Sequence, residues 1–239
     1  MKQTSLKARL LALACLALAG QVQAQSPSTS PWCAAGKVVS FAGLNWESGA
    51  LLTELMRFVM REGYGCKTET IPGNTVTMET ALASNDIQVL AEEWIGRSEA
   101  WNQAYKAGKV RAVGQVIQGA SEGWYVPDYV VHGDAKRGIK PSAPELRSVA
   151  DLPKYKAVFQ DDEEPGKGRF LNCPSGWSCE GVNSQKLKAY GLQSSYVNFR
   201  PGTGAALDAS VTSAVQRGKP VLFYYWTPTA LMGKHRFVQ

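Results

Sequence analysis

The sequence predicts an α/β protein with two lobes. Strand-like and helix-like segments alternate from Lys37 to Ala91, and a second alternating series follows Pro127. A β-α-β order of this kind is typical of a parallel sheet covered by helices. We therefore expect lobe 1 at residues 36–126 and lobe 2 at residues 127–239.

The elements of lobe 1 follow from local periodicity and from turn residues. The first helix repeats apolar side chains at helical spacing, and Gly63 and Gly65 end it. These apolar side chains are Leu51, Leu52, Leu55, Phe58 and Val59. We expect strands at 37–41, 66–71 and 86–91, and helices at 47–62 and 75–84.

The pattern breaks around residues 119–127, and lobe 2 then repeats the α/β theme. We expect helices at 149–155, 180–190 and 205–216, and strands at 157–159, 196–199 and 220–226. Ligands of open α/β sheets bind beyond the carboxyl ends of the strands. Two lobes would leave a cleft for a small ligand between them.

The N-terminus has the pattern of a cleavable export signal. A basic start with Lys2, Lys7 and Arg9 precedes the apolar run 10–20, which is too short to span a membrane. We expect a signal peptide at 1–24, a polar leader at 25–35 and a periplasmic mature chain. Three of the 26 Lys and Arg residues are lost with the signal, leaving 23 against 20 Asp and Glu. Without a basic block, nucleic-acid binding is not expected.

Four cysteines remain in the mature chain, and three pairings are possible. Their spacing favours Cys173 with Cys179 and Cys33 with Cys66, since Cys33 and Cys66 precede neighbouring strands. The two histidines, His132 and His235, lie far from the cysteines in sequence, so no metal site and no cofactor are expected. The acidic run 161–164 lacks the alternating spacing of a calcium loop, and we expect it to be solvated.

Several tryptophans lie at the ends of predicted elements, beside Gly, Pro, Asn and Glu, rather than on periodic apolar faces. Trp94 and Trp226 end strands, Trp177 lies between two cysteines, and Trp46 follows the first strand. Aromatic faces attract cations that cannot donate hydrogen bonds, such as quaternary ammonium groups. The pattern fits either a cage for such a cation or a set of ordinary aromatic core residues between the lobes.

The loop Cys173–Cys179 directly precedes a predicted helix. Backbone N–H groups at a helix N-terminus bind anions, and here they would belong to Ser178 and Cys179. A disulfide across the loop would hold these groups in place. The alternative is a stapled surface loop without a ligand.

Three segments resemble the glycine betaine/proline betaine-binding proteins of ABC importers. They are Ala91-Glu92-Glu93-Trp94, Cys173-Pro174-Ser175-Gly176-Trp177-Ser178-Cys179-Glu180 and Phe223-Tyr224-Tyr225-Trp226-Thr227-Pro228. The resemblance extends from about residue 36 to the end. It implies a two-lobed periplasmic binding protein fold of type II, and an ABC permease with its ATPase as partners.

Carried over by motif, the resemblance implies a cage of Trp94, Trp177 and Trp226, with the N–H groups of Ser178 and Cys179 binding the ligand carboxylate. Trp46 and Tyr225 are further candidates. The family histidine that follows the first cage tryptophan by four residues is replaced by Ser98, next to Arg97. Family chains continue beyond this one and return to lobe 1, so we expect a first lobe that is incomplete at its C-terminus.

Within the binding class, choline and carnitine compete with betaines as ligands. A periplasmic enzyme would need a nucleophile, an acid–base pair or a metal, and no motif of that kind is found. A sensory module that uses the same cleft is a further alternative.

Overall fold

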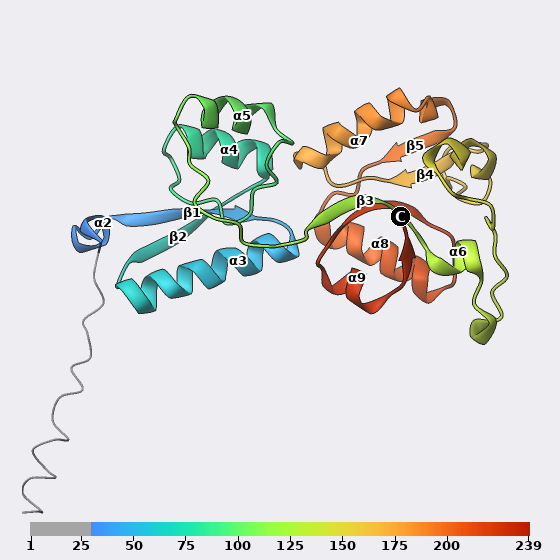
Figure 1. Cartoon of the computed structure of the whole chain (residues 1–239), viewed down its shortest axis with the longest axis horizontal. Coiled ribbons are helices and arrows are strands. Elements are labelled where there is room, and N and C mark those ends of the chain that lie inside the picture. The colour runs from blue at the N-terminus through green and yellow to red at the C-terminus, as the bar shows by residue number, and fades with distance from the viewer. Residues whose placement is uncertain (1–29) are drawn as a thin grey trace, which may run out of the picture.

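The computed structural model describes residues 30–239, so the expected signal peptide lies outside the described residues. The chain forms two α/β lobes side by side (Figure 1). The first lobe comprises the elements from α2 to α5, and the second comprises those from β3 to β7. The α/β class predicted from the sequence is therefore confirmed.

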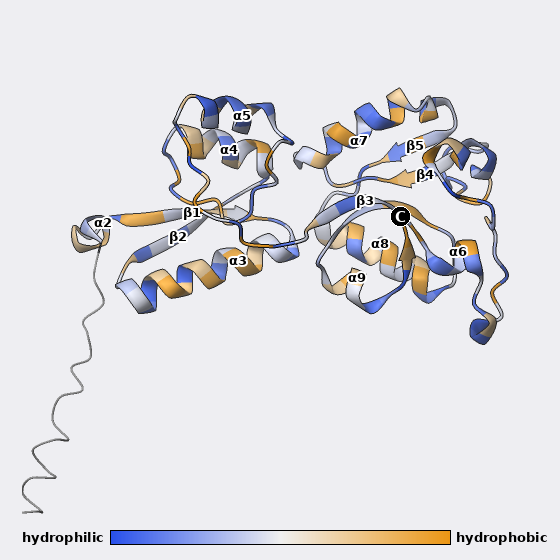
Figure 2. Cartoon of the chain, viewed as in Figure 1, coloured by the Kyte–Doolittle hydropathy of each residue, from blue (hydrophilic) through white to orange (hydrophobic). Residues whose placement is uncertain are grey.

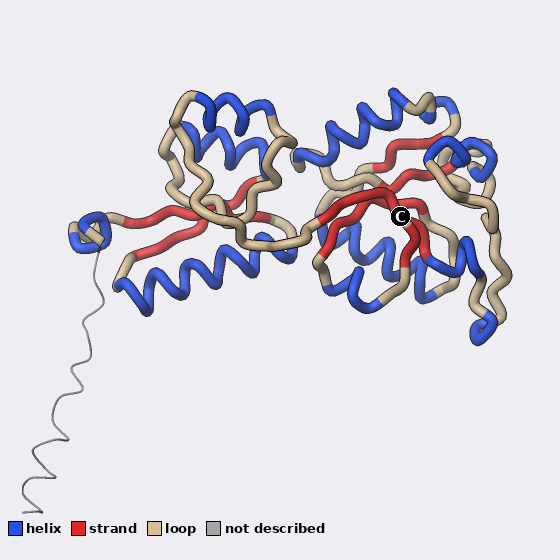
Figure 3. Tube along the Cα trace, in the orientation of Figure 1, coloured by secondary structure: helices blue, strands red, loops and turns tan. Residues whose placement is uncertain are grey.

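The first lobe is a two-stranded parallel sheet with helices on both faces (Figure 3). Helix α3 covers one face, while α4 and α5 lie over the other (Figure 1). The elements are α2 Pro31–Ala34, β1 Val38–Leu44, α3 Glu47–Phe58, the π-helix η1 Val59–Gly63, β2 Lys67–Gly73, α4 Thr75–Ala83 and α5 Glu99–Lys106.

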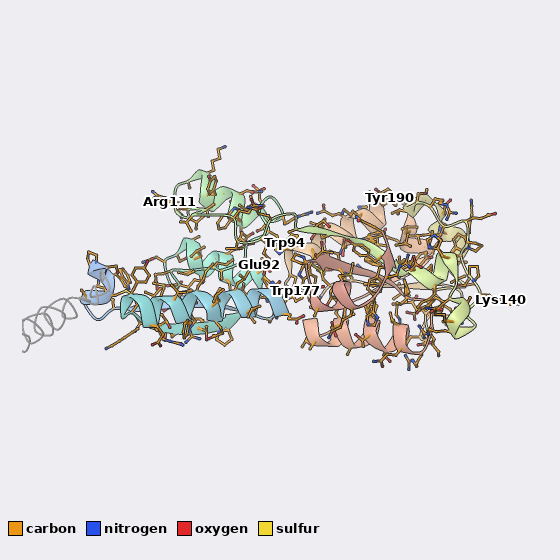
Figure 4. All side chains as sticks on the ribbon, turned by 60° about the horizontal axis from the view of Figure 1, so that its bottom comes forward. Glu92, Trp94, Arg111, Lys140, Trp177 and Tyr190 are labelled. Carbon is orange, nitrogen blue, oxygen red and sulfur yellow. A yellow bond between two sulfur atoms is a disulfide. The ribbon has the colours of Figure 1, made fainter. Side chains whose placement is uncertain are left out.

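The third strand expected at 86–91 is reduced to one bridge, between Phe41 and Val89. The Ala42 N–H donates to the Val89 carbonyl at 2.8 Å, and the Gln88 N–H donates to the Ser40 carbonyl at 2.8 Å. The segment therefore lies beside β1, as expected, but leaves it after this short contact. The departure carries Glu92 and Trp94 toward the second lobe (Figure 4).

Helix α3 forms where expected, yet its apolar stripe is turned to solvent. Leu51 is 68% exposed, and Leu55 and Phe58 are each 55% exposed. The small buried side of the helix is made by Gly49 and Thr53, whose hydroxyl donates to the Ala42 carbonyl. Two strands about 4.8 Å apart are too narrow to cover the whole apolar face of a helix.

The second lobe has a five-stranded sheet in the order β5-β4-β6-β3-β7. Strands β4, β5 and β6 run parallel, and β3 pairs antiparallel with β6 and β7. The strands are β3 Ser121–Pro127, β4 Gly168–Leu171, β5 Tyr196–Phe199, β6 Leu222–Thr227 and β7 Phe237–Val238. The helices are α6 Asp128–His132, η2 Ala135–Arg137, η3 Val149–Tyr155, α7 Ser178–Ala189, η4 Leu192–Ser194, α8 Gly204–Gln216 and α9 Ala230–Lys234.

Three predicted features of this lobe were wrong in detail. Residues 121–127 form a strand although Gly123 and Pro127 break the pattern, because the flanking β6 supplies the hydrogen bonds. Residues 157–159 are not a strand, and β4 begins at Gly168 instead. Asp161, expected to be solvated, is 1% exposed and pairs with Arg169 at 2.6 Å.

The main core lies in the second lobe and continues into the first. Hydrophobic colour is strong on β4 in Figure 2. The buried core cluster includes Phe170, Phe223 and Leu207 and extends through Trp177 to Trp46. The lobes are therefore joined by aromatic packing as well as by the chain. No helix of residues 30–239 has both the length and the apolar character to span a membrane.

Both disulfides have the expected pairing. Cys33–Cys66 links the residues that precede β1 and β2, and Cys173–Cys179 closes the loop before α7. The first is buried beside Val39 and Phe41 in a small core of its own.

Two buried carboxyl groups pack together in the first lobe. The Ser98 hydroxyl donates to one oxygen of Glu79, which is 2% exposed. Neither carboxyl oxygen of Glu93 has a hydrogen-bond partner among the described residues. Burial, together with the negative charge of Glu79, raises the pKa of Glu93 to about 8.

We expect the Cys33→Ser/Cys66→Ser double variant to lose about 3 to 4 kcal/mol of unfolding free energy. This bridge closes a sequence separation of 33 residues, and the unfolded chain gains the entropy of that loop when the bridge is removed. Opening the six-residue Cys173–Cys179 separation should cost only about 2 kcal/mol. Urea unfolding of both variants measures the difference, and a larger loss from the shorter ring would contradict the assignment.

The raised pKa of Glu93 predicts that the free energy of unfolding falls as the pH rises. Between the ordinary carboxyl pKa of 4.5 and the folded pKa of about 8, the folded state holds a proton that the unfolded state releases. The free energy of unfolding then falls by about 1.4 kcal/mol per pH unit from this group, and the slope ends above about pH 8. Urea midpoints should therefore decline from about pH 5 to about pH 8. The Glu93→Gln variant should flatten this decline, and an unchanged slope would contradict the assignment.

Candidate functional site

Four tryptophans from both lobes meet where the lobes touch. Trp46 follows β1 and opens α3, while Trp94 lies in the loop that leaves the first sheet. Trp177 immediately precedes α7, and Trp226 is the penultimate residue of β6. Glu92, Trp94 and Trp177 lie together at the junction in Figure 4. The structure therefore brings the three predicted cage tryptophans together and adds Trp46, which is 7% exposed.

The indole N–H groups of all four rings have acceptors in the first lobe. Trp46 and Trp94 both donate to Glu92 Oε1, at 3.0 and 2.8 Å. In the second lobe, Trp177 donates to Asn45 Oδ1 at 2.7 Å and Trp226 to Ser48 Oγ at 3.4 Å. Each of these four hydrogen bonds fixes the orientation of one ring. Since the polar edge of each ring is satisfied, the rings can present their remaining surface to one another.

The rings pack edge to face. The Trp177 ring centroid lies 5.4 Å from Trp46 and 5.5 Å from Trp226, with interplanar angles of 67° and 77°. Gly204 makes this packing possible, because a Cβ there would lie 3.0 Å from the Trp177 ring. In this geometry the positive edge of one indole faces the negative face of the next.

A small cavity lies between the rings. Its volume is about 30 Å³, which is room for about one or two water molecules. It is lined by Trp46, Thr75, Trp94, Glu122, Trp177, Ser178, Cys179, Tyr224 and Trp226. The lining joins every predicted cage residue to both predicted amide donors. A larger guest requires the rings, and with them the lobes, to separate.

The loop Cys173–Cys179 places the N-terminus of α7 at this cavity. Trp177 is the N-cap residue, and no side chain caps this end of α7. Among residues 30–239, neither the Ser178 N–H nor the Cys179 N–H has a hydrogen-bond acceptor. Gly176 adopts a φ of +87°, and a Cβ there would meet the Asn74 side chain at 2.5 Å. The loop thus offers two free donors and packs against the first lobe.

An ion pair between the lobes borders the cavity. Arg97 Nη1 lies 2.7 Å from Glu122 Oε1, and the Tyr224 hydroxyl donates to Glu122 Oε2 at 2.7 Å. Burial, reinforced by the Glu122 charge, holds the pKa of Tyr224 well above 10, so its hydroxyl remains a donor. Glu122 is thus a carboxylate whose charge is already paired.

Two predicted candidates lie behind the cavity rather than in its wall. Ser98 caps α5 and donates to Glu79. Tyr225 stacks on Trp226 with centroids 4.5 Å apart and donates its hydroxyl to Asp208 at 3.1 Å.

Sequence reasoning missed several members of the site. The wall residues Thr75 and Glu122 lie outside the three motif segments, and Tyr224 lies within one but was not singled out. The acceptors Asn45 and Ser48 are far in sequence from the rings they hold. The only available signal was proximity to Trp46 in sequence.

Comparison with known proteins gives a consistent result. The glycine betaine/proline betaine-binding periplasmic protein of Escherichia coli is 32% identical over 152 residues, covering 62% of this chain and 42% of the relative. The chain therefore spans less than half the length of this relative. Lactococcal OpuAC in its closed form with glycine betaine superposes with a TM-score of 0.66 at 17% identity, covering 84% of this chain and 69% of that one.

An ABC-transporter choline-binding protein in complex with choline also superposes with a TM-score of 0.66, at 17% identity, covering 84% of this chain and 63% of that one. These likenesses confirm the predicted type II periplasmic binding protein fold. Residues 37–239 match the family described as the substrate binding domain of ABC-type glycine betaine transport systems. Members of this family are solute-binding proteins, not enzymes. The chain belongs to this family.

Proposed function

We propose that the chain captures a small quaternary ammonium osmolyte, such as glycine betaine or proline betaine, between its two lobes. The observation that carries the proposal is the set of four tryptophans from both lobes, with every indole N–H engaged outside the cavity. A trimethylammonium group cannot donate hydrogen bonds, so aromatic faces suit it, at about 1 to 2 kcal/mol per desolvated ring.

Binding would exchange one set of aromatic contacts for another. In the structure the edge of one indole occupies the face of the next. A ligand that enters between separated lobes would replace these positive edges with its own positive charge. The free N–H groups of Ser178 and Cys179 at the start of α7 would hold a carboxylate.

The proposed setting is import. We place the mature chain in the periplasm, after removal of the predicted signal peptide, where it would deliver its ligand to an ABC permease driven by an ATPase. The family and the periplasmic location named for the relatives support this role.

Removal of a single cage ring should weaken binding. We expect Trp177→Ala and Trp226→Ala each to lower the affinity for glycine betaine roughly 5- to 30-fold, through loss of one cation–ring contact. Titration of the whole chain, followed by tryptophan fluorescence and calorimetry, measures the change.

The matched control is Trp32→Phe. Trp32 lies on α2 and donates to the Val38 carbonyl, away from the cavity, so its replacement should leave the affinity unchanged. A folded parent chain that binds neither glycine betaine nor choline would rule out the proposed function.

The Ser178 N–H can be removed with little disturbance of α7. Ser178 is the first residue of the helix, a position that tolerates proline, and Trp177 before it is extended at ψ 145°. We expect Ser178→Pro to lower the affinity for glycine betaine roughly tenfold. The affinity for choline should fall far less, because choline has no carboxylate. Ser178→Ala keeps the N–H and serves as the control.

Choline is the second candidate ligand, because an ABC-transporter choline-binding protein in complex with choline superposes on this chain. A parent chain that binds choline as tightly as glycine betaine, with both equally insensitive to Ser178→Pro, would favour it.

A further inference from the structure

The first lobe contains a group of carboxyl oxygens without hydrogen-bond partners. Within residues 30–239, every buried side-chain oxygen or nitrogen that lacks a partner belongs to one of three glutamates, Glu79, Glu92 or Glu93. Such groups are costly, because a desolvated charge without a partner has lost its interaction with water. Their concentration in the first lobe calls for a physical account.

The three glutamates differ in what surrounds them. Glu93, with a pKa of about 8, is protonated at neutral pH, and Glu79 accepts the Ser98 hydroxyl. Glu92 is 4% exposed and accepts the N–H groups of Trp46 and Trp94 on Oε1, while Oε2 has no partner. No Lys, Arg or His in the described part of the chain forms a salt bridge with Glu92, whereas Glu122 is paired with Arg97.

We propose that Glu92 is the counter-charge of the cage and makes it selective for a quaternary ammonium group over a neutral group of the same shape. The inference rests on the proposed function. Both rings that donate to Glu92 line the cavity, so a cation against their faces lies close to the carboxylate behind them. An anion that accepts the indole N–H also makes the ring more electron-rich, which strengthens its attraction for the cation.

The exclusion of water increases the effect. Between Trp46, Trp94 and the closed second lobe the carboxylate is screened weakly, so its attraction for a bound cation is larger than at a surface. The bound cation in turn provides the positive partner that the Glu92 carboxylate lacks in the free protein. A ligand with a neutral group in the cage gains nothing from Glu92, and this difference produces the selectivity.

The test compares glycine betaine with 3,3-dimethylbutyrate, which has a neutral carbon in place of the ammonium nitrogen. Glu92→Gln retains an oxygen that can accept both indole N–H groups but removes the charge. We expect this variant to be at least as stable as the parent and to bind glycine betaine about tenfold or more weakly, about 1.4 kcal/mol. Its affinity for 3,3-dimethylbutyrate should be unchanged or higher. Calorimetry on the whole chain gives both affinities, and thermal unfolding gives the stability.

The control is Glu69→Gln, which makes the same change in net charge on β2, away from the cavity. The Glu69 carboxylate accepts the Ser40 hydroxyl at 2.6 Å, and its replacement should leave both affinities as they are. The proposal is overturned if the Glu92→Gln variant binds glycine betaine as tightly as the parent, or if its affinities for both ligands fall equally. It is also overturned if the variant does not fold. A parent chain that binds no methylated ammonium compound removes the proposed function itself, which is a distinct outcome.

Discussion

The arrangement of the site depends on where four indole N–H groups find their acceptors. All of these acceptors, Asn45, Ser48 and Glu92, belong to the first lobe, although two of the rings belong to the second. Contact between the lobes therefore orients the two rings of the second lobe, Trp177 and Trp226. When the lobes separate, the indole N–H groups of Trp177 and Trp226 exchange their protein acceptors for water, while those of Trp46 and Trp94 keep their bonds to Glu92.

This asymmetry divides the site into a fixed half and a movable half. Glu92 holds Trp46 and Trp94 through bonds within one lobe, so that half is formed before closure. The second half depends on α7 and β6, which the Cys173–Cys179 bridge and the buried sheet make rigid. A lobe that is rigid up to the cavity wall preserves its ring geometry as it moves, and this lowers the ordering cost on binding.

The sequence allowed the α/β class, the four longest α-helices of the described residues (α3, α4, α7 and α8), both disulfides and the three tryptophans of the motifs to be predicted, because each leaves a local pattern. The third strand of the first lobe was overestimated, since apolar composition at 86–91 does not reveal that the chain turns away after Val89. Strand β3 was missed because its pairing with β6 outweighs Gly123 and Pro127. The hydrogen-bond partners of the rings could not be predicted, since Trp177 and Asn45 are 132 positions apart. The exposure of the apolar stripe of α3 could not be predicted either, because periodicity shows that a face is apolar but not what covers it.

The electrostatics of the cavity match a particular kind of ligand. Within residues 30–239, the Glu92 carboxylate behind the rings of the first lobe has no salt-bridge partner, and two N–H groups without acceptors lie at a helix N-terminus in the second lobe. The field between them favours a molecule with positive charge toward Glu92 and negative charge toward Ser178 and Cys179, which describes a zwitterion. Choline would use only the first end of this field. A neutral solute would use neither end, and it would still have to displace the edge-to-face contacts of Trp177. Because the two ends belong to different lobes, a zwitterion is also the ligand that draws the lobes together most strongly, so the same charges that select it favour the closed state.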